Sequence, residues 1–275
     1  MDTAHAIPAV HAAPEDLPGA SVPRRDILGI PMALTDYEGA MDVMDEMVEQ
    51  RHRGWVCAAS AHSVVAALDD AVMYQALTEA TITVPDGMPI VWAANALGEH
   101  LPDRVYGPEL MHRYCKRSAE MGHRVWLYGG CDQGALAQLA LNLRRNHPGL
   151  RIVGGYSPPY RSLSEEEDEE IGRQINDARP DVLWVGIGVP KQERWMMRMR
   201  DRVNVPVMCA VGAAFDFHAG LVSQAPSWMQ ERGLEWTYRI AQEPRRLLPR
   251  YLNANPRFMA GFAQQYLRER TAGTV

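Results

Sequence analysis

The sequence predicts an α/β fold whose central sheet is largely parallel. Short apolar runs alternate along the chain with stretches of helical periodicity, as expected when each strand is followed by a helix that crosses the sheet. The chain has 275 residues, 47% of them hydrophobic, which suffices to bury a sizeable core in one large domain or two small ones. Polar residues and glycines follow several of the apolar runs, and in such sheets ligands bind where the strands end.

The apolar runs are expected to form strands. They occupy residues 27–32, 55–60, 80–86, 124–130, 151–156, 181–188 and 205–217. Stretches between them are expected to form helices, at residues 37–50, 64–77, 108–121, 134–146 and 165–178. The last helix is preceded by Ser164, with Glu167 three residues later, which is the pattern of a capping box.

The charge of the chain is unevenly distributed. The net charge is −6 and the pI is near 5.9, which gives no electrostatic reason to expect a nucleic-acid partner. Acidic residues concentrate at residues 164–170, whereas residues 236–275 carry seven arginines against two glutamates. We therefore expect any anionic partner to meet the C-terminal part of the chain.

The cysteines and histidines show no metal-binding pattern. The four cysteines, which form no C-x-x-C pair, are Cys57, Cys115, Cys131 and Cys209. Each lies in or beside an apolar segment, so we expect buried thiols in a reducing cytoplasm and no disulfide. The nine histidines show no H-x-x-x-H spacing, so neither a metal site nor a bound cofactor is expected.

No apolar run reaches the ~18 to 20 residues that a membrane-spanning helix needs. Residues 1–24 are rich in alanine, proline and histidine, and they lack the cationic start and the continuous apolar stretch of a signal peptide. We expect them to form a flexible tail.

Two glycine pairs end predicted strands. Gly129 and Gly130 follow one strand, and Gly186 and Gly188 follow another. Neither pair has the full G-x-G-x-x-G or G-x-x-x-x-G-K-[ST] spacing, so a standard dinucleotide site or P-loop has little support. Glycines beside a helix start still permit the close approach of a phosphate, and tight turns are the alternative.

Asp86 stands at a strand-to-helix corner in "TVPDGMPIVW". Its carboxylate could cap the helix that is expected to start near Pro89. It could also reach a ligand at the edge of the sheet, where Gly87 leaves room beside it. The local pattern leaves both interpretations open.

Six stretches, in this order along the chain, carry a resemblance to a known family. They are "PDGMPIVW", "DRVYGPELM", "LYGG", "GGYSPPYR", "VGIGVPKQERWM" and "VGAAFDFHAGLVSQAPSWMQERGLEWTYRIAQEPRRLLPRY". From Ile27 to Tyr251 the chain resembles the WecG/TagA/CpsF family of bacterial glycosyltransferases, family 26. The resemblance implies an inverting transferase that moves a sugar from a UDP-sugar donor to a polyprenyl-diphosphate-linked acceptor sugar, in exopolysaccharide or other cell-surface polysaccharide synthesis.

The resemblance also implies an architecture and a location. It implies a Rossmann-like core of the GT-E type at residues 25–233 and a basic, amphipathic C-terminal segment at residues 234–275. This segment would complete the active site and contact an anionic membrane surface. The enzyme would be cytoplasmic, peripheral at the inner face of the cytoplasmic membrane, and would work without a bound metal.

Two residues are implied to be catalytic. Asp86 would be the general base, a role that is compatible with capping a helix. Arg104 in "DRVYG" would meet the negative charge that grows on the departing β-phosphate, because a guanidinium stays charged and binds two oxygens. An exposed ion pair with Asp103 or Glu99 is the alternative for Arg104.

Other matched positions are implied to bind the donor. Gln192 and Asp216 would contact its sugar or uridine, although Asp216 alone would be interpreted as a turn residue. The family's T-x-N element is not kept, because "AASAH" supplies Ala58 and Ser60, with His62 just beyond. This departure puts the family's usual N-acetylmannosamine donor in doubt and leaves room for a glucose-type donor. His62 could bind sugar or simply begin a helix.

The C-terminal segment is expected to contain short helices at most, separated by prolines at positions 244, 249 and 256. Three aromatic residues at helical spacing form one face: Phe258, Phe262 and Tyr266. That face could lie in a membrane interface, or pack on the domain or on a second subunit of a homo-oligomer. Four arginines near the "YR…EPRR" motif are assigned to the acceptor diphosphate and lipid headgroups: Arg239, Arg245, Arg246 and Arg250.

Two other classes of protein are alternatives. A non-catalytic regulator that binds a UDP-sugar on the same core would tolerate the loss of Asp86 and keep its affinity for UDP. An NAD-dependent oxidoreductase is supported only by generic glycines, and the missing G-x-G-x-x-G and ribose-binding acid count against it.

Overall fold

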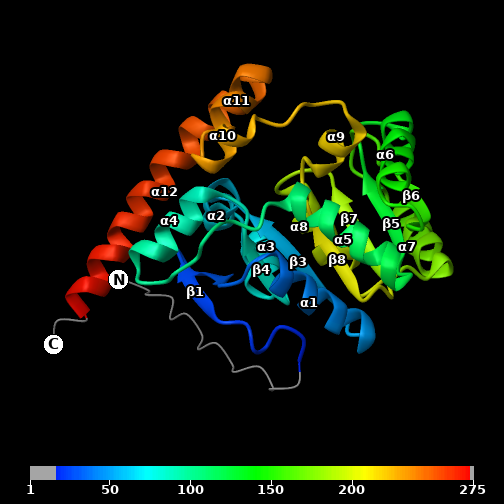
Figure 1. Ribbon diagram of the computed structural model, residues 1–275, viewed down its shortest axis with the longest axis horizontal. Coiled ribbons are helices and arrows are strands. Elements are labelled where there is room, and N and C mark those ends of the chain that lie inside the picture. The colour runs from blue at the N-terminus through cyan, green and yellow to red at the C-terminus, as the bar shows by residue number, and fades with distance from the viewer. Residues whose placement is uncertain (1–16, 273–275) are drawn as a thin grey trace.

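The computed structural model describes residues 17–272, in which eight strands form one sheet in the order β1-β2-β4-β3-β8-β7-β5-β6 (Figure 1). The strands are β1 (Arg24–Ile27), β2 (Ile30–Ala33), β3 (Gly54–Ala59), β4 (Ile82–Pro85), β5 (Arg124–Gly129), β6 (Arg151–Tyr156), β7 (Val182–Gly186) and β8 (Val207–Ala210). In this spatial order, every pair of neighbouring strands from β2 across the sheet to β6 is parallel. The strand β1 pairs antiparallel with β2 at one edge. The predicted Rossmann-like α/β fold with a largely parallel sheet is confirmed.

Helices cover both faces of the sheet (Figure 1). One face carries α1 (Tyr37–Glu49), α5 (Gly107–Met121), α6 (Gln133–Asn146) and α9 (Ala214–Ala219). The other carries α2 (Ala61–Asp69), α3 (Ala71–Thr78), α4 (Met88–Ala96), α7 (Glu165–Ala178) and α8 (Lys191–Met199). Along β3, Val56 and Ala58 face the first layer while Trp55 and Cys57 face the second, because side chains of a strand alternate between its faces.

The apolar run at residues 27–32, predicted as one strand, is a hairpin of β1 and β2. Leu28 and Gly29 turn the chain with positive φ angles of 56° and 86°. The Asp26 carboxylate accepts the Gly29 N–H (2.9 Å) and so stabilises the turn. A glycine and an Asp at these places are the turn signals that the apolar run concealed.

The helix predicted at residues 64–77 is also divided, into α2 and α3. Asp70 lies between them with extended backbone angles, and its carboxylate accepts the N–H groups of Val72 and Met73. A short acidic side chain favours this N-cap position over a helix interior. The periodic pattern of apolar residues continues through α2 and α3 because both helices pack on the same face of the sheet.

The strand predicted at residues 205–217 is shorter, since β8 ends at Ala210 and α9 begins at Ala214. Gly212, with φ of 55°, lies in the turn between them. A continuous apolar run does not distinguish a buried strand from a buried helix, and both elements are buried here. Asp216 therefore lies on a helix.

Of the tail predicted at residues 1–24, residues 1–16 lie outside the described part of the chain. The described remainder folds against the core. The Gly19 N–H donates to the Glu46 carboxylate (3.3 Å), and Arg24 begins β1.

After α9 the chain forms α10 (Ser227–Glu231), α11 (Glu235–Gln242) and one long helix, α12 (Pro244–Ala272), which lies along α2 (Figure 1). The prediction of short helices at most is therefore wrong for this segment. Pro249 and Pro256 lie inside α12, although a proline removes a helix hydrogen bond and crowds the preceding turn. Tertiary contacts, above all the packing of Ala254 and Phe258 in the core, hold the helix in place. Between residues 17 and 272 no helix combines the length and apolarity of a membrane span.

The aromatic face of α12 packs on the protein, not on a membrane. Phe258 is 2% exposed and belongs to the core, and Phe262 stacks on it with ring centroids 6.4 Å apart. Gly261 brings the helix against Leu28 in the β1–β2 turn. Of the interpretations left open for this face, the structure supports packing on the domain.

Replacing Phe258 with alanine should lower the free energy of unfolding by about 3 to 5 kcal/mol, because it opens a cavity in the core. Met259→Ala, on the neighbouring residue that is 63% exposed, should change it by less than about 0.5 kcal/mol. Urea unfolding of both variants measures the difference. Similar small losses in both would show that α12 is not part of the folded core.

Candidate active site

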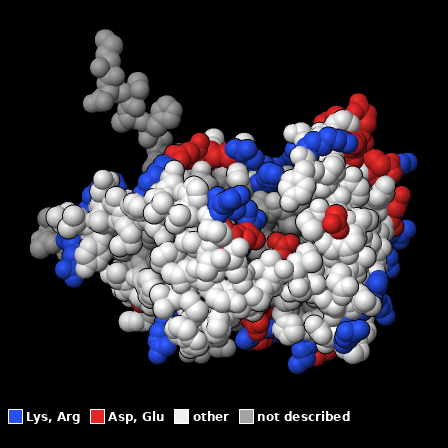
Figure 2. Space-filling view, turned by 90° about the horizontal axis from the view of Figure 1, so that it is seen from above, with Lys and Arg blue, Asp and Glu red and all other residues white. Residues whose placement is uncertain are grey.

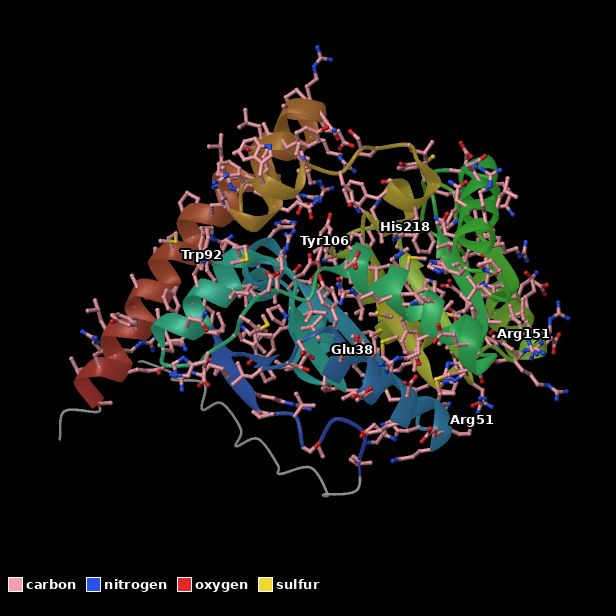
Figure 3. The ribbon with its side chains drawn as sticks, viewed as in Figure 1. Glu38, Arg51, Trp92, Tyr106, Arg151 and His218 are labelled. Carbon is pink, nitrogen blue, oxygen red and sulfur yellow. The ribbon has the colours of Figure 1, made fainter. Side chains whose placement is uncertain are left out.

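A cleft of about 1050 Å³ opens at the carboxyl edge of the sheet. Residues that follow β3, β4, β5, β7 and β8 form one side of it, and α11 and α12 form the other. Figure 2 looks onto this face, where Lys and Arg side chains gather around a hollow that has acidic side chains beside it. Tyr106 lies here, near the centre of the molecule, whereas Arg51 and Arg151 mark the amino edge of the sheet (Figure 3).

Most of the residues predicted to act in catalysis or substrate binding line this cleft. They are Ser60, His62, Asp86, Arg104, Gly130, Gly186, Gly188, Gln192, Asp216, Arg239, Arg246 and Arg250. Gly129 and Arg245 do not. A Cβ atom at Gly129 would lie 2.4 Å from the Gly186 carbonyl oxygen, so the glycine there serves the close approach of β5 and β7. Arg245 is exposed on α12, away from the lining.

Asp86 is half-buried and faces the cleft from the end of β4. Gly87 is the N-cap of α4, which no side chain caps, so Asp86 does not have the predicted capping role. Instead Asp86 Oδ1 accepts the N–H of Gly107 at the start of α5 (2.7 Å). Burial raises the pKa of Asp86 to about 7, opposed by the Gly107 N–H and Arg104 and reinforced by Glu235. Such a carboxyl can take up and release a proton near neutral pH.

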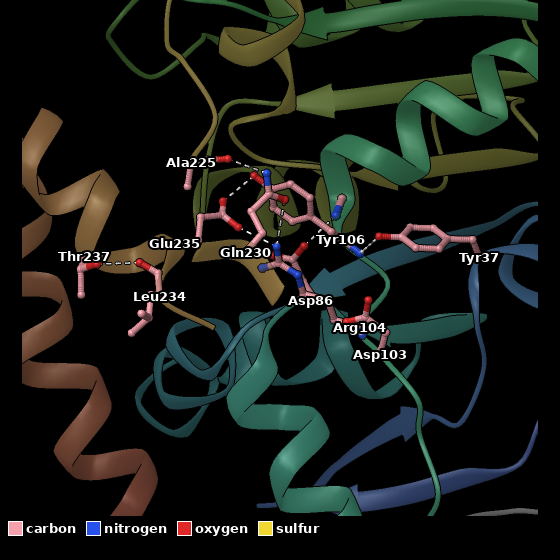
Figure 4. Close-up of polar contacts among 11 residues, drawn as sticks. Tyr37, Asp86, Asp103, Arg104, Tyr106, Ala225, Gln230, Leu234, Glu235 and Thr237 are labelled. Carbon is pink, nitrogen blue, oxygen red and sulfur yellow. Dashed lines mark hydrogen bonds and ion pairs between the residues drawn. The ribbon is translucent and has the colours of Figure 1, made fainter. Parts of the chain in front are cut away.

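Arg104 forms a buried ion pair with Glu235 from the first turn of α11 (Figure 4). Arg104 Nη2 lies 2.7 Å from Glu235 Oε2, and the two side chains are 11% and 8% exposed. The Tyr106 hydroxyl donates to the other Glu235 oxygen (2.6 Å), and the guanidinium stacks 4.3 Å above the Tyr106 ring. The exposed ion pair expected as the alternative is not formed, since Asp103 accepts only the backbone N–H of Arg104.

Three arginines from α11 and α12 form a positively charged wall of the cleft: Arg239, Arg246 and Arg250. Arg246 pairs with Glu243. Burial, with Arg246 and Arg239 nearby, lowers the pKa of Arg250. Burial, with Arg250 nearby, lowers the pKa of His62 to about 4, so this imidazole is neutral at pH 7. The lowered pKa values show that positive charges crowd this wall. An anionic ligand would therefore stabilise the charged arginines.

Gln192, at the start of α8, ties this helix to the turn after β8. Its Oε1 accepts the N–H of Gly212 after β8 (3.0 Å), and its Nε2 donates to the buried Glu193 (2.8 Å). Gly188 has φ of 81° with no atom within 4 Å of the Cβ position, which leaves this loop open to a ligand.

Ser60 and Asp216 reach the cleft from helix starts. The Ser60 side chain forms a capping box with Ser63 at the start of α2, so its hydroxyl already accepts a backbone N–H (3.4 Å). Asp216, in the first turn of α9, has its pKa raised by burial, with Arg246 lowering it. Both side chains can present oxygens to a sugar hydroxyl.

The two residues that contact the Arg104 guanidinium most closely, Tyr106 and Glu235, were not predicted. Both lie in stretches that carry the family resemblance, but no spacing marks them, because Glu235 and Arg104 are 131 residues apart. Only the tertiary fold brings them together.

The cysteines mostly lie where the sequence predicts. Cys57, Cys115 and Cys209 are buried, but Cys131 is exposed. It follows Gly130 into the loop that leaves β5, so the apolar run before it does not bury it. Among the side chains that the structure describes, no group of three or more His, Cys, Asp or Glu is arranged to hold a metal ion.

The fold and the cleft define an α/β enzyme whose site combines a carboxyl of near-neutral pKa with arginines suited to phosphate groups. The chain belongs to the glycosyl transferase WecG/TagA/CpsF family, whose profile matches residues 25–272. It is therefore a glycosyltransferase, as the resemblance implied.

Three similar relatives share one name, N-acetylglucosaminyldiphosphoundecaprenol N-acetyl-beta-D-mannosaminyltransferase. One from Bacillus spizizenii strain W23 is 30% identical over 183 residues, 65% of this chain and 69% of the relative. One from Bacillus subtilis strain 168 is 25% identical over 219 residues, 79% of this chain and 83% of the relative. One from Staphylococcus aureus strain MRSA252 is 31% identical over 173 residues, 62% of this chain and 65% of the relative.

Replacing Asp86 with asparagine should stabilise the protein at pH 8 by about 1 to 3 kcal/mol and change it much less at pH 4. The raised pKa means that the wild type loses stability as pH rises from about 4 to about 7, because the unfolded chain ionises first. Asparagine cannot ionise and avoids this loss. Urea unfolding at both pH values measures the gain, and an equal effect at both would mean that ionisation of Asp86 is not its cause.

Proposed function

We propose that this glycosyltransferase moves N-acetylmannosamine from a UDP-linked donor to N-acetylglucosamine carried on a polyprenyl diphosphate, in the synthesis of a bacterial cell-surface polysaccharide. The observation that carries the proposal is Asp86, a carboxyl of raised pKa that faces a cleft with an arginine wall. The names of the relatives support the two sugars. They give no support to a glucose-type donor or to a non-catalytic regulator.

In the proposed reaction the ionised Asp86 accepts the proton of the attacking acceptor hydroxyl. That oxygen bonds to C1 of the donor sugar on the face opposite UDP, while the bond from C1 to the β-phosphate oxygen breaks. The electron pair leaves with UDP, the proton stays on Asp86, and C1 is inverted. A base with a pKa near 7 is available at neutral pH and still strong enough to assist proton transfer.

The arginines divide between the two diphosphates in this proposal. Arg104 lies on the core side, next to Asp86, and would meet the charge on the departing UDP. The wall of Arg239, Arg246 and Arg250 lies on the side of α11 and α12 and would hold the acceptor diphosphate. The donor would lie over the strand ends that carry Ser60, His62, Gly130, Gly186, Gly188, Gln192 and Asp216.

Asp86→Asn should lower transfer by roughly 100-fold or more while UDP still binds, because the general base is lost. In the wild type, kcat/KM should rise with pH through about 7 as Asp86 ionises. Transfer from UDP-N-acetylmannosamine to a short-chain polyprenyl-diphosphate acceptor measures both, with UDP affinity from calorimetry as the control for folding. Transfer at a near wild-type rate would place the base elsewhere.

We also propose that the exposed side of α12 lies on an anionic membrane, at the inner face of the cytoplasmic membrane. Four large apolar side chains on this helix are 43% to 66% exposed: Leu248, Leu252, Met259 and Leu267. Their spacing of four, seven and eight residues places them along one side of the helix. Trp236 is also exposed, and Arg245 lies between it and Leu248 in the sequence. Basic and apolar groups therefore occur together, as they do on helices that lie on a membrane surface.

The double variant Leu252→Asp/Met259→Asp should bind anionic vesicles about tenfold more weakly than wild type, because it places two charges on the apolar stripe. Leu141→Asp is the matched control, since Leu141 is 52% exposed on α6 and lies outside this stripe. Vesicle co-sedimentation at low and high salt is the measurement, and salt should weaken wild-type binding. Unchanged vesicle binding with an altered oligomeric state would instead make the stripe a subunit contact.

A further inference from the structure

Glu235 has both carboxylate oxygens engaged by core residues, although it belongs to the C-terminal part of the chain. Oε2 lies 2.7 Å from Arg104 Nη2, and Oε1 accepts the Tyr106 hydroxyl at 2.6 Å (Figure 4). Glu235 is 6% exposed. A carboxylate removed from water to this extent is tolerated only when its charge and its lone pairs are satisfied, as they are here.

The same contacts leave part of the Arg104 guanidinium available. Within the described residues its hydrogen bonds engage Nη2, with Glu235 at 2.7 Å and Gln230 at 3.5 Å, while Nε and Nη1 form none. The Tyr106 ring supports the guanidinium plane from 4.3 Å. Arg104 is therefore held in orientation without losing the donors that an anion in the cleft would need.

Asp86 lies within the electrostatic field of this group. The charged and titratable groups around it come from the core and from the C-terminal helices: Tyr37, Arg104 and Tyr106, and Glu235, Arg239 and Tyr251. Arg104 favours the ionised carboxylate of Asp86, and Glu235 opposes it. The strength of the base thus depends on a residue outside the strand-and-helix core.

We propose that Glu235 is a positioning residue for catalysis: from α11 it holds Arg104 and Tyr106 beside Asp86. This inference rests on the proposed function. Glu235 need not touch the substrate. It fixes the direction of Arg104 and maintains the basicity of Asp86 through its own negative charge.

The direct test is Glu235→Gln, which keeps the shape of the side chain but removes its charge. The apparent pKa in the pH profile of kcat/KM should move to lower pH, because a like charge beside Asp86 is lost. The kcat should fall roughly tenfold or more, because Arg104 is held less firmly. Tyr106→Phe keeps the charge and removes one contact of Glu235, so it should lower kcat without moving the profile to lower pH.

Glu269→Gln is the matched control. Glu269 is another acidic residue that ties the C-terminal helices to the core, through Arg25, but it does not line the cleft. This variant should keep the wild-type kcat and pH profile. If Glu235→Gln has the same kcat and pH profile as Glu269→Gln, Glu235 has only a structural role. If Glu235→Gln has a higher kcat than wild type, Glu235 restrains Arg104 from acting. Either result overturns the proposal.

A second measurement does not require turnover. The stability gained at pH 8 from Asp86→Asn should be smaller in the Glu235→Gln background, because the repulsion between Glu235 and the ionised Asp86 is already removed. An unchanged gain would overturn the coupling between the two carboxyls. If the wild type transfers no sugar, the proposed function fails while this double-mutant cycle still tests the link between Glu235 and Asp86.

Discussion

The site depends on keeping the Asp86 carboxyl in a place where its negative charge is costly. Burial at the end of β4 raises its pKa to about 7, while the Gly107 N–H and Arg104 limit the rise and keep the ionised form accessible. These opposing effects come from the fold, because parallel strands end at one edge and α5 begins beside them. In the proposed mechanism the protein gives up stability at neutral pH and in return has a base of suitable strength.

The C-terminal helices contact the hydrophobic core, line the cleft and form part of the exposed surface. One side of α12 buries Phe258 in the core, α11 places Glu235 in contact with both Arg104 and Tyr106, and the wall of Arg239, Arg246 and Arg250 faces the cleft. The remaining side of α12 exposes large apolar residues. These contacts are divided between two helices, since Glu235 and Arg239 lie on α11 whereas Arg246, Arg250, Phe258 and the exposed apolar residues lie on α12.

The fold and the position of the cleft could be predicted because they follow local patterns, whereas the roles expected of Arg104, Gln192 and Asp216 rested on the family resemblance. Alternating apolar and helical segments fix an α/β fold, and the residues that follow each strand, such as Ser60, Asp86 and Gly188, must then meet at one edge. The Arg104–Glu235 pair could not be predicted, since it joins residues 131 positions apart and depends on where α11 docks. Nor could the continuity of α12, because tertiary packing overrides the local effect of Pro249 and Pro256.

The most direct test of this account is the pKa of Asp86 itself. Titration of the carbon-13 carboxyl resonances of aspartate-labelled protein, with Asp86→Asn to assign the signal, measures it without substrate or turnover. We expect a midpoint near 7. A midpoint near 4, the value of an ordinary solvated aspartate, would contradict it, because neither the stability cost nor a base tuned to neutral pH would then exist.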